Sequence, residues 1–372
     1  MALTNFAALT NEQLTVWSRD VWKWARARMF VGKFAGSDSN AMLHRVTELT
    51  QSEKGARAVL TLVADLEGDG VAGDRTLEGN EEALKSYDQV IQLDQMRHAN
   101  RHEGRMADQK SVVTFRTNSR DVLSHWLSDR MDQLAFLTLS GISYSKTTDG
   151  RDRVGSDFPY LEFASDVQPP SPTRHLRWDA NSGTNGELLE GDTTAIEPAD
   201  IPTWRTLVNL KAFARNQFIR PVRGEDGTEV FNVFMTPTGI ARLKEDEDFL
   251  RAWRHAMPRS SNNPLFKGTD VIYVDGLAIF DYRHVFDTTG AASGDKWGSA
   301  GDVDGNRILL CGAQCLGMAD IGNPEWVEKG FDYENQQGIS ISKITGLLKP
   351  QFRSQITGQD EDFGVIALDT AI

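Results

Sequence analysis

Residues Ala64–Glu82 read ADLEGDGVAGDRTLEGNEE, and apolar and polar residues alternate in the run before them, Arg57–Leu66. A second alternating run, SYDQVIQLDQM, follows at Ser86–Met96. Alternation with a period of two on both sides of a glycine-rich stretch is typical of two strands joined by a turn. The sequence therefore predicts a long β-hairpin with the glycine-rich stretch at its tip.

A dinucleotide site is one alternative for this stretch. Gly68-x-Gly70-x-x-Gly73 follows a predicted strand, and Asp94 stands further on, as in a dinucleotide-binding motif. That motif also needs a helix N-terminus against the pyrophosphate, and Gly79 interrupts the residues that would form it. Residues 65–82 carry seven carboxylates against one arginine, which disfavours a bound phosphate.

A calcium loop is the other alternative, because Asp65, Glu67 and Asp69 alternate before Gly70. The twelfth position of such a loop needs a bidentate glutamate, and Thr76 stands there. The flanks also predict strands rather than helices. A solvated acidic loop, whose glycines permit positive φ, explains the same residues.

The overall charge limits the partners of the chain. Its 372 residues include 53 acidic and 40 basic ones, a formal net charge of -13. Because this charge repels phosphate backbones, we expect only local, non-specific contact with DNA. No signal-peptide pattern opens the sequence and no apolar run is long enough to cross a bilayer, so we expect no membrane association.

No residue pattern predicts catalysis. His98 and His102 stand four apart but supply only two metal ligands, and Cys311 and Cys315 lie in an apolar run that favours buried thiols. No nucleophile-elbow serine and no phosphate-binding loop occurs. The sequence thus predicts no catalytic, cofactor-binding or metal-ligating residue, and a protein that is not an enzyme.

Residues Asn11–Phe34 predict an amphipathic helix. One face carries apolar residues at helical spacing: Trp17, Val21 and Trp24. Another face carries basic residues: Arg19, Lys23 and Arg26. Three roles are open: packing on a neighbouring chain through the tryptophans, contact with DNA through the basic face, or binding to a membrane surface.

After the hairpin the apolar period changes to that of a helix. Steps of three and four predict a long helix within Asp108–Gly141, with Gly141 as its stop. Turn residues dominate Thr147–Asp200 and predict an irregular excursion rather than a packed layer. Helices are predicted at Thr203–Arg215 and Pro237–His255, with the strand EVFNVFMTP between them and short strands after them. The class is α+β.

The N-terminal helix and the hairpin share one difficulty, because no segment of the sequence is evidently dedicated to covering either. An isolated two-stranded hairpin is marginal in water. Both features are explained if each chain drapes them over neighbouring copies, which places the function in assembly.

The stretch GDGVAGDRTLEGNEEAL resembles a signature of the major capsid proteins of tailed double-stranded DNA bacteriophages, in the branch with the HK97-like fold. The likeness continues with LDQMRHAN, FLTLSG, FIRPVRG and FNVFMTPTGIARLKEDEDF. It extends through NPLFKGTDVIYVDGLAIFD, ILLCGAQCLGMA and KGFDYENQQGISISKITGLLKPQF. The order and spacing of these pieces cover nearly the whole chain, and the segment 147–200 matches least.

The resemblance implies an α+β subunit with the HK97-like capsid fold. Residues 1–51 would form an N-terminal arm, and residues 52–96 an extended hairpin called the E-loop. Residues 97–230 would form a peripheral domain with the long helix as its spine. Residues 231–317 would form an axial domain, and residues 318–372 would return to the peripheral domain.

The resemblance also implies the assembly. Hexamers and pentamers of this chain would form an icosahedral phage head that encloses double-stranded DNA. The implied partners are a separate scaffolding protein, a portal and a decoration protein, with assembly in the bacterial host cytoplasm and a final place in the virion capsid. A nanocompartment shell of the same fold, which encloses protein cargo, is one alternative, and a calcium-binding module is another.

The hairpin tip and the segment after the hairpin carry opposite charges. Carboxylates stand in the tip at Asp69, Asp74, Glu78, Glu81 and Glu82. Basic side chains follow at Arg97, Arg101 and Arg105. We hypothesise that the tip of one copy meets the basic segment of a neighbour, which would steer assembly more than add affinity. A solvated loop with unrelated arginines is the alternative, because exposed ion pairs contribute little.

Overall fold

The computed structural model describes residues 23, 25, 28–46, 57–63, 70–82, 86–110, 115–224, 227–256, 271–354 and 358–372. Four of the predicted inter-subunit contacts lie outside these residues: Trp17, Val21, Trp24 and Asp69. Most of the predicted N-terminal helix also lies outside them.

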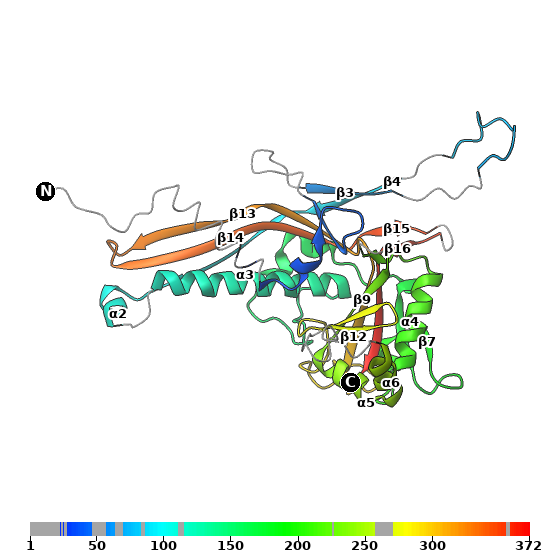
Figure 1. Ribbon diagram of the computed structural model, residues 1–372. Coiled ribbons are helices and arrows are strands. Elements are labelled where there is room, and N and C mark those ends of the chain that lie inside the picture. The colour runs from blue at the N-terminus through cyan, green and yellow to red at the C-terminus, as the bar shows by residue number, and fades with distance from the viewer. Residues whose placement is uncertain are drawn as a thin grey trace.

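The described residues form an α+β protein with two larger sheets and one long helix (Figure 1). The first sheet has the strand order β1-β2-β13-β14-β5. Its strands are β1 (Ala35–Gly36), β2 (Leu43–Val46), β5 (Asp94–Arg101), β13 (Leu316–Phe331) and β14 (Gln336–Leu348). The long antiparallel pair β13–β14 makes this sheet an extended arm, which reaches to the left in Figure 1.

The second sheet has eight strands in the order β10-β11-β9-β12-β17-β6-β7, with β8 paired to β9. Its strands are β6 (His175–Asp179), β7 (Glu187–Glu190), β8 (Val222–Arg223), β9 (Glu229–Met235), β10 (Val271–Val274), β11 (Leu277–Asp281), β12 (Gly305–Cys311) and β17 (Val365–Ala371). Two further pairs stand alone: β3 (Arg57–Val63) with β4 (Ser86–Gln92), and β15 (Gln351–Arg353) with β16 (Asp360–Asp362).

The α-helices are α2 (Arg105–Lys110), α3 (Phe115–Ser140), α4 (Trp204–Asn216), α5 (Pro237–Glu245) and α6 (Glu247–Ala256). Short 3₁₀ helices occur at η1 (Val31–Phe34), η2 (Phe158–Tyr160), η3 (Glu162–Asp166), η4 (Pro172–Arg174) and η5 (Thr193–Ala195). Helix α3 runs alongside the β13–β14 arm, α4 lies at one side of the second sheet, and α5 and α6 lie at its lower end (Figure 1).

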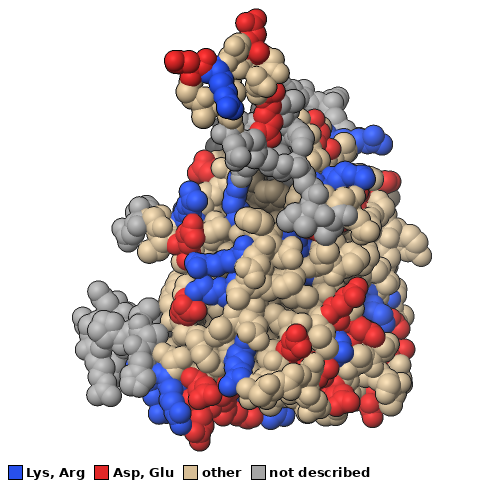
Figure 2. All heavy atoms as spheres, turned by 90° about the vertical axis from the view of Figure 1, so that its right-hand side faces the viewer, with Lys and Arg blue, Asp and Glu red and all other residues tan. Residues whose placement is uncertain are grey.

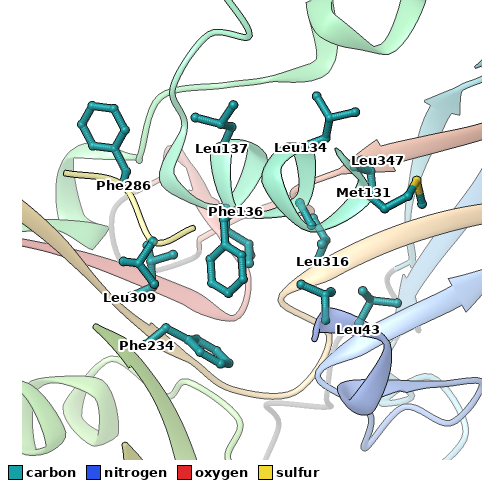
Figure 3. Close-up of a cluster of buried hydrophobic side chains, with 14 of the residues drawn as sticks. Leu43, Met131, Leu134, Phe136, Leu137, Phe234, Phe286, Leu309, Leu316 and Leu347 are labelled. Carbon is teal, nitrogen blue, oxygen red and sulfur yellow. The ribbon is translucent and has the colours of Figure 1, made fainter. Parts of the chain in front are cut away.

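Helix α3 lies where the two sheets meet. Every residue from Met131 to Ser140 is buried, so this part of the helix is covered on all sides. Leu43, Leu316 and Leu347 reach it from the first sheet, and Phe234 and Leu309 reach it from the second (Figure 3). Gly141 ends the helix as predicted, in the left-handed conformation with φ +66°. Only glycine fits there, because a Cβ would lie 2.6 Å from the carbonyl oxygen of Gln168.

The end of the N-terminal segment is fixed to the middle of α3. The backbone N–H groups of Phe30 and Val31 donate to the Asp132 carboxylate, at 2.8 and 3.0 Å, and the Tyr282 hydroxyl donates to it at 2.6 Å. Burial raises the pKa of Asp132, although these hydrogen bonds oppose the rise. The Phe30 ring stacks on Tyr282 at 4.0 Å between centroids, and Met29 is buried. This segment is therefore covered by its own chain, which the sequence did not indicate.

Arg307 of β12 joins the second sheet to the end of α3. Its guanidinium donates to both carboxylate oxygens of Asp369, at 2.7 and 2.8 Å, and to the carbonyl oxygen of Ser140, at 2.9 Å. Burial raises the pKa of Asp369, but the charge of Arg307 and hydrogen bonds from His175 and Arg307 outweigh it, so the pKa lies below its ordinary value. Asp369 thus contributes stability above the pKa of an unfolded aspartate, and this contribution is lost as the pH falls through the folded pKa.

Several predicted elements are confirmed, and two are corrected. The predicted helix at 203–215 is α4, and the predicted long helix is α3, preceded by the separate α2. The helix predicted at 237–255 is two helices, because Asp246 between them has extended backbone at ψ 119° and its carboxylate accepts from Trp204 N. The irregular excursion predicted at 147–200 is wrong for β6 and β7, which belong to the second sheet.

The sheets also differ from the expected domain limits. Strands β13 and β14 lie beside α3 (Figure 1), whereas β17, at the end of the range 318–372, pairs with β12 in the second sheet. Strand β6 then pairs in parallel with β17. The second sheet therefore contains strands from both sides of 231–317.

We predict that Arg307→Met lowers the free energy of unfolding by about 3–5 kcal/mol, because Asp369 then remains buried without its cation. Arg242→Met is the matched control, since the Arg242–Glu245 pair is exposed and such pairs contribute about 0–1 kcal/mol. Urea unfolding of the purified protein, followed by circular dichroism, measures both. Equal unfolding midpoints for the two variants would contradict the prediction.

Candidate assembly surfaces

The predicted hairpin is confirmed as the antiparallel pair β3–β4, in register from Arg57↔Gln92 to Val63↔Ser86. Its base packs on the first sheet in a cluster of buried side chains: Val46, Ala58, Leu60, Ile91, Ala319 and Leu348. The hairpin base is therefore covered within the chain, contrary to the expectation that only a neighbour could cover it.

Two glycines of the first sheet make room for the hairpin base. A Cβ at Gly346 would lie 2.2 Å from the carbonyl oxygen of Gln92, and one at Gly317 would lie 3.0 Å from the Leu60 side chain. Sequence analysis missed both residues, although a glycine inside a strand is a signal of close approach by another backbone. The base is also tied to β15, since Gln89 Nε2 donates to the carbonyl oxygen of Gln351 at 2.6 Å.

The hairpin tip, residues 70–82, projects from the body of the molecule (Figure 1). Figure 2 shows red carboxylates around one blue basic side chain on this projection. The carboxylates are Asp74, Glu78, Glu81 and Glu82, all exposed, and the basic residue is Arg75. The tip is the part of the hairpin that its own chain leaves open to a partner.

The glycines of the tip permit turns and do not make room for a close contact. Gly70, Gly73 and Gly79 have φ of +69°, +69° and +89°, and a Cβ at any of them would meet no atom within 4 Å. Residues 73–82 form turns rather than a helix. The described part of the tip therefore lacks the helix N-terminus that the dinucleotide alternative requires.

The predicted basic residues stand on the arm. Arg97 and Arg101 are exposed on β5, which pairs with β14 along one edge of the sheet, and exposed Arg105 begins α2. The Arg101 guanidinium lies 4.8 Å from the centre of the Phe331 ring. Helix α2 and the hairpin tip lie at opposite ends of the molecule (Figure 1). The structure thus brings the acidic and the basic predicted residues together only if they belong to different copies.

The histidines and cysteines have structural surroundings. The His98 ring stacks on Trp126 at 4.7 Å between centroids, and His102 Nε2 accepts from Gln337 N at 3.1 Å. Cys311 and Cys315 are buried free thiols, as predicted. Across the described residues, no three His, Cys, Asp or Glu side chains are placed to hold a metal ion together. Among the described helices, none combines the length and the apolar character needed to cross a bilayer.

Comparison with known proteins agrees with this geometry. The family described as phage capsid protein matches residues 5–372. The major capsid protein of Pseudomonas phage KPP25 is 57% identical over 365 residues, which cover 98% of this chain and 96% of that protein. The capsid of Ralstonia phage GP4 superposes with a TM-score of 0.73 at 24% identity, over 92% of this chain and 90% of that one. The capsid of cyanophage Pam1 superposes with a TM-score of 0.67 at 18% identity, over 100% and 96%.

The chain therefore belongs to the family of phage capsid proteins, and its fold is the HK97-like capsid fold. Within that family its role is that of the major capsid protein, whose copies form the capsid shell of the virion. Neither the nanocompartment nor the calcium-binding alternative is favoured by these matches.

We predict that Gly346→Ala loosens the hairpin from the sheet, because the new Cβ would collide with the backbone of Gln92. Limited trypsin digestion after Arg57, which pairs with Gln92 at the hairpin base, should accelerate by about tenfold, as a loss of about 1.4 kcal/mol of local stability implies. Gly32→Ala is the control, since its Cβ would meet only ordinary contacts at 3.5 Å. Indistinguishable digestion of the two variants would show that the close approach does not hold the hairpin.

Proposed function

We propose that hexamers and pentamers of this chain build an icosahedral head around double-stranded DNA. The observation that carries the proposal is the separation of two oppositely charged groups of exposed residues: the acidic hairpin tip, and the arginines of β5 and α2. The tip and α2 lie at opposite ends of one subunit (Figure 1). Complementary patches at two different places on a subunit generate head-to-tail contacts, which close into rings. A separate scaffolding protein, a portal and a decoration protein are the proposed partners, and the host cytoplasm is the proposed place of assembly.

In this proposal the parts of the subunit divide the work. Residues 1–51 are the N-terminal arm of the family and the hairpin is its E-loop, and both contact neighbouring copies. The first sheet with α3 is the peripheral domain, and the second sheet with α4, α5 and α6 is the axial domain near the symmetry axes. The role is structural throughout, with DNA contacted only non-specifically, because the net charge of -13 disfavours tight binding to phosphates.

The contact itself joins the acidic tip of one copy to the basic residues of the next. Glu78 and Glu81 on the tip, and Arg101 and Arg105 on the arm, are exposed. Such exposed charges contribute about 0.2–1 kcal/mol a pair, so they act mainly on the rate and orientation of encounter and weaken with salt. Repetition over every subunit of a shell multiplies this small term.

Reversing the arm charges tests the contact. We predict that Arg101→Glu with Arg105→Glu lowers the yield of assembled shells several-fold at low salt and makes the yield rise with added salt, because two attractions become repulsions that salt screens. Adding Glu78→Arg and Glu81→Arg should restore assembly. The matched control is Arg242→Glu with Arg254→Glu, two exposed charges near the second sheet.

Sedimentation velocity and negative-stain electron microscopy, with and without a co-expressed scaffold candidate, measure the yield. An unchanged yield with an unchanged salt dependence in the reversed variant would remove the charge contact. A protein that stays monomeric under every condition, including with the scaffold, would remove the proposed head.

A further inference from the structure

The turn between β13 and β14 presents an exposed tyrosine on strained backbone. Asp332, Tyr333 and Glu334 have φ of +52°, +49° and +65°, a region that side chains other than glycine rarely occupy in succession. The Tyr333 side chain is 104% exposed, so nothing in its own chain covers it. We call these three residues the knob: one aromatic ring flanked by two carboxylates at the end of the arm.

Hydrogen bonds of the next two residues, Asn335 and Gln336, hold the backbone of the knob in place. Asn335 N donates to the carbonyl oxygen of Asp332 at 2.9 Å, and Asn335 Oδ1 accepts from Arg105 N at 3.4 Å. Gln336 Nε2 donates to the carbonyl oxygen of Glu103 at 2.8 Å. A turn whose backbone is already held by hydrogen bonds loses little backbone freedom when it binds, which lowers the entropic cost of the contact. These hydrogen bonds therefore hold the strained turn in one conformation, in which Tyr333 points into solvent.

A groove of about 960 Å³ lies further along the same arm, between β5, α3 and the loop 152–158. Trp126, on which the His98 ring stacks, and Phe158, whose ring centre lies 5.2 Å from the Arg153 guanidinium, provide aromatic surface within it. Val154 on its lining is 95% exposed, so the groove has an apolar side open to solvent. An aromatic side chain of a partner would find matching surface there.

The groove is basic as well as aromatic. Arg130 Nη1 and Arg153 Nη2 both donate to Gln133 Oε1, at 2.7 and 3.1 Å, which places two guanidinium groups side by side. Burial and the neighbouring Arg130 lower the pKa of Arg153. Arg97 lines the same groove. Two aspartates also line it: Asp152, which is paired with Lys146 at 3.0 Å, and the exposed Asp157. Asp129 lies 3.7 Å from Arg130, so three arginines face these carboxylates. A carboxylate entering the groove would relieve repulsion between the arginines.

We propose that the knob of one copy seats in this groove on a neighbouring copy, with the Tyr333 ring against Trp126 and Phe158 and the flanking carboxylates near the arginines. The knob and the groove are different places on one chain, so the contact is head-to-tail and joins successive subunits. This inference rests on assembly of copies into a shell, but it does not depend on the contact of the hairpin tip proposed above.

The acidic hairpin tip is the competing occupant of the groove. It carries carboxylates and the exposed Leu77, but residues 70–82 contain no aromatic side chain. The knob combines an aromatic ring with two carboxylates on a fixed turn, which matches both properties of the groove. We therefore assign the groove to the knob.

Cysteine cross-linking between two chains tests the assignment. Chains with Tyr333→Cys are mixed with chains with Val154→Cys, assembled, and oxidised with glutathione disulfide. The native Cys311 and Cys315 are buried and do not compete. We expect a covalent dimer on a non-reducing gel from the mixture and not from either chain alone. Phe218→Cys mixed with Val154→Cys is the matched control, because Phe218 is an exposed aromatic residue, also at positive φ, beyond the arm.

A second measurement covers the case in which the variant does not assemble. We expect Tyr333→Ser to lower shell yield by about tenfold, as loss of an anchoring aromatic residue does, and Phe218→Ser to leave it unchanged. Shells that form from the mixed cysteine chains without the dimer would overturn the inference and leave shell formation intact. A dimer from Leu77→Cys with Val154→Cys instead would assign the groove to the hairpin tip. Absence of shells from the unaltered protein would count against the proposed head.

Discussion

The burial of one helix between two sheets is the constraint on which the rest of the subunit depends. The C-terminal part of α3, Met131–Ser140, has no exposed residue, so it must be packed by the first sheet, by the second sheet and by the end of the N-terminal segment at once. Two polar anchors fix that arrangement: Asp132 holds the backbone of Phe30 and Val31, and Arg307 holds the last carbonyl oxygen of the helix. Buried polar groups of this kind are costly unless fully paired, which favours one arrangement over others.

The elements with strong local periodicity could be predicted from the sequence. The hairpin β3–β4, the helix α3 and its glycine stop follow from patterns that extend over many residues. Strand β6 could not be predicted, because it has only five residues between turn signals and acquires its identity from pairing with β17, almost two hundred positions away. The break at Asp246 was equally hidden, since its cause is a hydrogen bond from Trp204 in another helix.

The candidate surfaces divide in the same way. The charge of the hairpin tip and of Arg97, Arg101 and Arg105 is a property of the sequence, but their placement at opposite ends of one subunit depends on how β5 pairs with β14. The packing of the hairpin base was harder still to predict from the sequence. Its covering depends on Gly317 and Gly346, where the absence of a side chain admits another strand, and such a role becomes visible only once that strand is in place.

A shell built from identical copies needs contacts that are individually weak, because strong contacts would trap misassembled copies, and it needs them to discriminate between correct and incorrect neighbours. Exposed charges satisfy the first requirement but not the second, since any opposite charge attracts. Shape can provide that discrimination. The hairpin is fixed at its base to its own sheet, and the turn between β13 and β14 is held at the end of the arm. Packing of the sheets on α3 sets the direction in which both project. The features that neighbours would recognise are therefore positioned by the core of a single subunit, so that folding of the subunit sets the geometry of its assembly.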